Sequence, residues 1–211
     1  CIITIIYERK WNMNINLLVK YVLRLIERNG WYANRKFHDS GYWISEIEKY
    51  GYQSFEPARQ IICELGGLSF LEYAPITYQR MIKLKQRDGQ EIPSGFALDI
   101  KTACENCLDI LKELHMENQV ELYSGATFAF DALSAARDEE IILDTGTIKS
   151  VVGEAIFPIG TVHPDGISFI SEKCKIYTVF DDSIYLSGET IELYLNMMFI
   201  KSLKPISLYQ I

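Results

Sequence analysis

The chain has 211 residues, a length typical of a single domain. Its 28 acidic residues outnumber 21 lysines and arginines, so the formal net charge is −7, which disfavours direct binding to nucleic-acid phosphates and favours a basic partner. Hydrophobic residues at 48% and charged residues at 23% exclude an intrinsically disordered chain, and every apolar run is much shorter than the roughly 20 residues that span a membrane.

The first twelve residues have the character of a separate tail. They contain no methionine, and Met13 stands where a start codon would be natural. Charged residues 8–10 follow apolar residues 1–7, whereas a secretory signal places its charges first. We therefore expect residues 1–12 to be an upstream or disordered tail, residues 13–211 to form one domain, and the protein to be cytoplasmic. The five irregularly spaced cysteines agree with that compartment, because they suggest no disulfide framework.

Three helices are predicted in the first third of the chain. Apolar residues recur at three- and four-residue spacing over residues 14–29, and Gly30 supplies a helix stop. Ser40 and Ser54 are positioned to cap a second and a third helix, the third with Pro57 in its first turn. The residues expected to face inward are Trp43, Ile44, Ile47 and Tyr50 in the second helix and Ala58, Ile61, Ile62 and Leu65 in the third.

The middle of the chain gives a mixed pattern. Residues 68–73 form the first clear strand pattern, and a capping box that begins at Thr102 predicts a helix to about Met116. Residues 128–137 fit either a helix or a strand. Short apolar runs predict further strands at 81–85, 96–100, 120–123 and 141–143.

The last third is dominated by strand patterns. Strands are predicted at 155–158, 166–171 and 175–180, followed by a closing helix at about 190–200. That helix is expected to bury Ile191, Tyr194, Leu195 and Met198. Helices first and strands afterwards are typical of an α+β fold rather than of alternating α/β units.

The tripeptide Asp144-Thr145-Gly146 has the form in which aspartic proteases present a catalytic carboxylate. Those enzymes need two such carboxylates sharing a proton, each presented after a strand. The other tripeptide of this form, Asp39-Ser40-Gly41, stands at the predicted start of the second helix instead. Asp144-Thr145-Gly146 is also a favourable turn after a strand. We therefore expect the chain not to be an enzyme, with a hydrolase built on Asp144 as a remote alternative.

The sequence does not contain the residue patterns that a metal or cofactor site requires. Cys104 and Cys107 have the spacing of half a zinc site or of a redox pair, but no second pair of ligands follows at a suitable distance. The histidines His38, His115 and His163 are dispersed, and no Gly-rich phosphate loop occurs. We expect no metal, no cofactor, and two cysteines packed in the core.

Two short acidic runs are candidates for contact with a basic partner: Asp138-Glu139-Glu140 and Asp181-Asp182. Each run alone fits an ordinary solvated loop, although such charges also steer a basic partner toward its site. The chain is rich in tyrosine, with 13, and exposed tyrosines dominate many binding hot spots. Periodicity does not show which tyrosines are exposed, whereas Trp31 follows a helix stop and is expected to anchor the core.

Three groups of landmark residues, in this order and spacing, resemble the SUKH superfamily, and in particular its third subfamily. They are Gly30, Trp31 and Arg35, then Gly66, Gly67 and Leu68, and finally Pro158 and Gly160. The chain departs from the family pattern at Thr161, where an acidic residue is usual, and at Lys173-Cys174, where Asp-Gly is usual. Segment 74–150 is also longer than compact members need.

The resemblance implies an α+β fold with N-terminal helices, a curved and mostly antiparallel sheet, and a C-terminal helix. It implies a bacterial immunity protein that neutralises a polymorphic or contact-dependent toxin, often a nuclease or another nucleic-acid-modifying enzyme, by stoichiometric occlusion. The landmark residues would then determine the fold, and the elaborated centre could carry specificity. A regulatory interaction module with a host partner is the alternative. Toxin identity and oligomeric state stay open.

Overall fold

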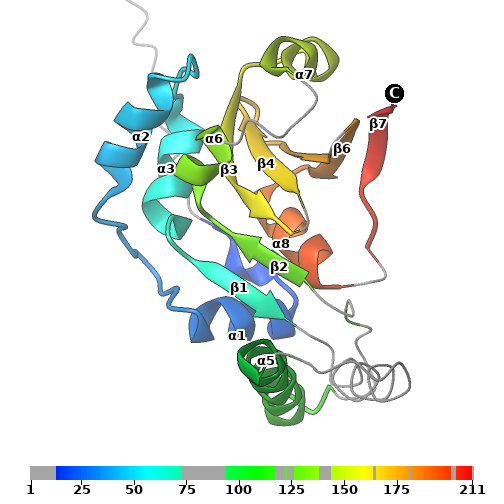
Figure 1. Cartoon of the computed structure of the whole chain (residues 1–211). Helices are drawn as coiled ribbons and strands as arrows, with labels where there is room; N and C mark the ends of the chain where they lie inside the picture. Colours follow the sequence, from blue (N-terminus) through cyan, green and yellow to red (C-terminus); the bar gives the residue numbers. More distant parts are fainter. Residues whose placement is uncertain are drawn as a thin grey trace, which may run out of the picture.

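The computed structural model describes residues 13–72, 94–116, 122, 126–137, 144–163, 165–180, 182–200 and 203–210 (Figure 1). Its helices are η1 (Ile15–Leu17), α1 (Lys20–Arg28), α2 (Ser40–Glu48), α3 (Glu56–Leu65), α5 (Ser94–Glu113), α6 (Ala132–Arg137), α7 (Thr145–Val152) and α8 (Ile191–Phe199). Its strands are β1 (Ser69–Glu72), β2 (Ala126–Ala129), β3 (Ile156–Val162), β4 (Gly166–Ser171), β5 (Ile176–Phe180), β6 (Ser183–Gly188) and β7 (Ile206–Gln210).

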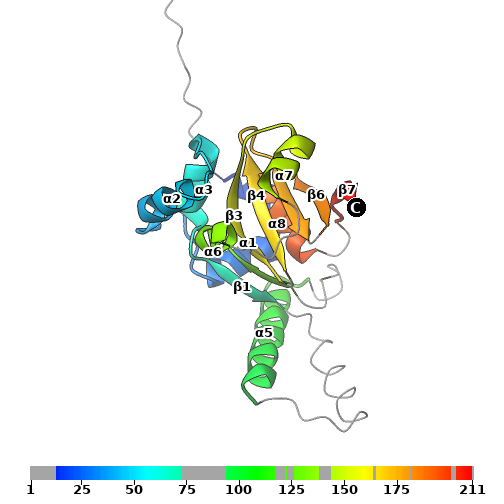
Figure 2. The same cartoon turned by 45° about the horizontal axis from the view of Figure 1, so that its top comes forward.

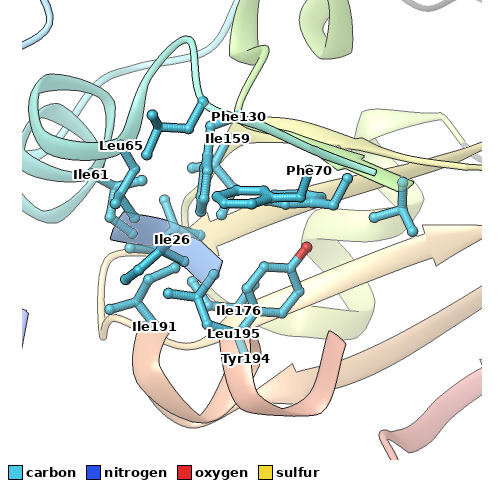
Figure 3. Close-up of a cluster of buried hydrophobic side chains, with 14 of the residues drawn as sticks. Ile26, Ile61, Leu65, Phe70, Phe130, Ile159, Ile176, Ile191, Tyr194 and Leu195 are labelled. Atoms are coloured by element: carbon cyan, nitrogen blue, oxygen red, sulfur yellow. The ribbon is translucent and has the colours of Figure 1, made fainter. Parts of the chain in front are cut away.

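The seven strands form one antiparallel sheet in which the spatial order follows the chain order from β1 to β7. Helices α1 and α8 lie behind the sheet in the view of Figure 2. Side chains from α1, α3 and α8 meet those of the strands in the buried core of Figure 3. The arrangement confirms the predicted α+β class, with helices before the sheet and a helix near its end.

Helix α8 is fixed to the sheet by a buried polar contact as well as by apolar packing. The Tyr194 hydroxyl lies 2.7 Å from the Ser168 hydroxyl, which lies 3.2 Å from that of Thr178. All three residues are buried, so each hydroxyl needs a partner inside the protein. Burial raises the pKa of Tyr194, which keeps this phenol neutral.

The N-terminal helices follow the predicted pattern with three corrections. The predicted caps are displaced: Asp39 precedes α2, and Phe55 precedes α3, because the Ser54 hydroxyl donates to Glu48 instead. Helix α3 buries the four residues expected of it, and Gly30 stops α1 with a φ of +95°. The helix predicted over residues 14–29 is divided, because the Asn196 side chain accepts the Val19 N–H and donates to the Leu17 carbonyl. The expectation that Tyr50 faces inward is wrong: α2 ends at Glu48, and Tyr50 is 51% exposed.

In the middle of the chain, one strand that was predicted from a short apolar run is wrong. Residues 96–100 are part of α5 rather than a strand, and α5 begins at Ser94, ahead of the predicted cap at Thr102. Short apolar runs do not distinguish strand from helix, and here the run continues into a helical stripe that buries Cys107, Ile110 and Leu111. Residues 128–137, which fit either a helix or a strand in the sequence, contain parts of both: β2 ends at Ala129 and α6 begins at Ala132.

The C-terminal third contains the predicted strands and two more. Strand β4 matches its predicted bounds, β3 extends to Val162, and β6 and β7 were not predicted. Helix α8 buries Ile191, Tyr194 and Leu195, whereas Met198 is only partly buried. Of the predicted strand 120–123 the structure describes Leu122 alone, in an isolated bridge to Ile200. The predicted strands 81–85 and 141–143 lie outside the described residues.

Candidate interaction surfaces and the landmark residues

The first two landmark groups meet at the end of α3. The Arg35 guanidinium donates to the carbonyls of Glu64 and Gly66, both at 2.8 Å, and so pairs carbonyls that the helix end leaves without intrahelical donors. The Trp31 indole N–H donates to the Glu64 carboxylate at 3.3 Å. Partial burial lowers the pKa of Arg35 and raises that of Glu64. Residues about thirty positions apart thereby form one joint.

The same joint continues into the sheet. The Gly67 N–H donates to the Phe130 carbonyl at 2.9 Å, and the Phe130 N–H donates to the Leu68 carbonyl at 2.8 Å. Beside β2, Gly160 of β3 leaves no room for a side chain: an added Cβ would lie 2.1 Å from the Ala129 carbonyl oxygen. A register shift falls between Pro158 and Gly160. All eight landmark residues therefore occupy packing or backbone-contact positions.

Asp144 serves as the N-terminal cap of α7. One carboxylate oxygen accepts the N–H groups of Gly146 and Thr147 at 2.8 and 3.0 Å, and the other accepts the Thr147 hydroxyl at 2.8 Å. These hydrogen bonds lower the pKa of Asp144, the Thr147 hydroxyl first among them. The tripeptide is thus a helix start, and the capping role accounts for an aspartate here.

Replacing this cap tests the role directly. Asp144→Ala should lower the melting temperature by roughly 2–4 °C, because two backbone N–H groups lose their acceptor, whereas Asp144→Asn should stay close to the wild type. Thermal unfolding by circular dichroism measures both variants. Equal melting temperatures for Asp144→Ala and the wild type would contradict the capping role.

Cys104 and Cys107 are both buried on α5, as expected of cysteines that pack in a core. Within the described ranges, no three or more His, Cys, Asp or Glu side chains are grouped so that they could hold a metal ion. Among those same residues, no helix is long and apolar enough to cross a membrane.

The acidic runs are only partly visible. Asp138, Glu139, Glu140 and Asp181 lie outside the described residues. Asp182 lies in the turn between β5 and β6, and its carboxylate accepts the Ser183 hydroxyl at 2.9 Å. The structure therefore does not bring the two runs together into one described site.

Two exposed tyrosines belong to α2 and to the turn that follows it. Helix α2 lies outside α3 at the edge of the molecule (Figures 1 and 2). Tyr42 is 58% exposed and Tyr50 is 51% exposed. Between them Lys49 pairs with Glu46, and this pair is the main reason why the pKa of Lys49 is raised, with Tyr42 and Tyr50 adding to it. We call Tyr42, Glu46, Lys49 and Tyr50 the α2 face. Sequence periodicity missed it because Tyr50 was assigned to the core.

A second exposed surface lies across the molecule, where α8 and β6 meet β7. A groove of about 180 Å³ is lined there mainly by Leu186, Leu193, Met197, Leu203 and Ile206. Leu193 and Ile206 are 46% and 60% exposed. We call it the C-terminal groove. Its polar lining includes Glu189 and Lys204, so opposite charges stand at its rim.

Comparisons of the chain with protein-family models, with curated proteins and with solved structures find no match in any of the three.

Proposed function

We propose that the protein is a cytoplasmic bacterial immunity protein of the SUKH type. It would bind a cognate toxin stoichiometrically and cover its active site or substrate channel, without catalysing a reaction. The toxin would be basic, as nucleases typically are, which matches the formal charge of −7 on this chain.

The observation that carries this proposal is the convergence of the landmark residues. Trp31 and Arg35 precede Glu64 and Gly66 by about thirty residues, yet they contact them directly. Gly160 lies much further along the chain and packs against Ala129 at the end of β2. The next residue, Phe130, donates its N–H to the Leu68 carbonyl. Residues that a family shares because they determine its fold are expected to contact one another in the folded chain. These contacts therefore support the resemblance and the function that it implies.

The arrangement of polar groups also favours binding over catalysis. The Asp144 carboxylate caps a helix, and the buried hydroxyls of Ser168, Thr178 and Tyr194 bond to one another. By contrast, tyrosine and leucine side chains on the α2 face and in the C-terminal groove are exposed. Exposed aromatic and apolar residues on a packed scaffold are typical of protein-binding surfaces.

Co-expression with the polypeptide encoded beside this gene tests the proposal. We expect this chain to restore growth to cells that produce that polypeptide, and the two proteins to co-purify in a one-to-one complex. A standard complex of this kind buries about 1,600 Å² in total. Absence of both rescue and complex, with both proteins folded, would contradict an immunity function and favour a regulatory module with another partner.

A further inference from the structure

We propose that the α2 face is the surface on which the basic partner docks, with Tyr42 and Tyr50 as its anchors. The inference rests on the proposed function, because it assigns the binding surface of that same activity. It differs from the sequence-based candidates, which were the acidic runs at residues 138–140 and 181–182.

The geometry of the face suits a binding hot spot. Tyr42 and Glu46 are one turn apart on α2, and Lys49, which pairs with Glu46, follows the end of the helix. Tyr50 comes next in the turn after α2, and its side chain is exposed there. The opposite side is occupied: Ile47 is buried, and the Trp43 ring packs edge-on against Phe37 at 4.7 Å between centroids. Because the inner side holds the helix in place, the two exposed tyrosines stand on a rigid support. Tyrosine on a rigid element contributes a large contact area at little cost in entropy.

The charge around the face selects a basic occupant. The stretch from Asp39 to Arg59 contains four carboxylates, one lysine and one arginine, a net charge of −2. Arg59 belongs to this surface because its guanidinium donates to the Ser54 hydroxyl beside Glu48. Two of these carboxylates are held in position by neighbours: Glu46 pairs with Lys49, and Glu48 accepts the Ser54 hydroxyl. An acidic surface with aromatic anchors is complementary to a positively charged protein and speeds its association.

The C-terminal groove does not show the same selectivity. Glu189 pairs with Lys175 at 3.5 Å, and Lys204 also lines the groove, so these charges do not add up to an acidic surface. Its edge strand β7 carries a register shift against β6 and follows Lys204-Pro205, features that discourage further strands from adding to a sheet edge. The groove therefore provides the control surface, because it lies on the opposite side of the molecule from α2 in Figure 1.

The experiment measures binding of purified variants to the polypeptide encoded beside this gene, which is first separated from the co-expressed complex by denaturation and then refolded. Tyr42→Ala and Tyr50→Ala should each weaken the affinity roughly tenfold, and the double variant roughly a hundredfold. Ile206→Ala in the C-terminal groove is the matched control and should stay within about twofold. Lys49→Glu should speed association about two- to fivefold at low salt, and the gain should vanish at high salt.

The Lys49→Glu variant matters because a misfolded protein cannot bind faster. Melting curves of all variants should match the wild type, since the substituted side chains are exposed. If the wild type binds and the double tyrosine variant binds equally well, the α2 face is not the docking surface, but the proposed immunity function is unaffected. A loss confined to Ile206→Ala would move the docking surface to the C-terminal groove. Absence of wild-type binding and rescue would overturn both proposals.

Discussion

Among the glycines whose surroundings the structure describes, Gly160 is expected to tolerate replacement by alanine least. The new Cβ would lie 2.1 Å from the Ala129 carbonyl oxygen and 3.1 Å from the Ala129 carbonyl carbon and from the Phe128 ring. The nearest atoms are main-chain atoms of β2, so they cannot rotate away as a flexible side chain could. Strands β2 and β3 must separate or the chain must unfold. We expect the free energy of unfolding to fall by about 3 kcal/mol or more.

Gly41→Ala is the matched control for this substitution. No atom lies within 4 Å of a Cβ at Gly41, which sits in α2, where alanine favours the helix. The control should be neutral or stabilise the protein by up to about 1 kcal/mol. Urea unfolding of both variants gives the comparison. A Gly160→Ala protein with wild-type stability would refute the close approach of β2 to β3.

The elements that the sequence predicts best are those whose pattern is long and self-contained. The stripe of Ala58, Ile61, Ile62 and Leu65 spans two turns after Pro57, so α3 could be predicted together with its buried side. Residues 96–100 were assigned to a strand because five residues do not establish a period. Strands β6 and β7 have mixed patterns, and their pairing depends on partners far away in the chain.

The candidate surface was harder to predict than the fold. Exposure of Tyr50 depends on where α2 ends, and a shift of two residues at a helix end turns a side chain from the core to solvent. The landmark residues were found by their order, but their role depends on contacts between separate segments. Nothing in the local sequence shows that Arg35 reaches the carbonyls of Glu64 and Gly66.

Arg35→Met should destabilise the fold without removing a residue of the α2 face. Methionine keeps much of the aliphatic stem but removes both donors, so the carbonyls of Glu64 and Gly66 lose their partner at the joint between α3 and β1. Hydrogen bonds from charged groups contribute about 1.5–3 kcal/mol, and Arg35 is only partly buried, so we expect a total loss of about 2–3 kcal/mol. Arg35→Lys should lose less, because an ammonium can still reach one carbonyl.

Arg28→Met is the control. Arg28 pairs with Glu113 on the surface, so its loss should change stability by less than about 0.5 kcal/mol. Urea unfolding would contradict the joint if Arg35→Met were as stable as Arg28→Met. Growth rescue at different temperatures then distinguishes Arg35, which stabilises the fold, from Tyr42 and Tyr50, which contact the partner. Arg35→Met should rescue cells at low temperature, where enough protein is folded, and fail when warmed. A protein without Tyr42 and Tyr50 should fail at every temperature while remaining folded, because its loss is one of contact with the partner.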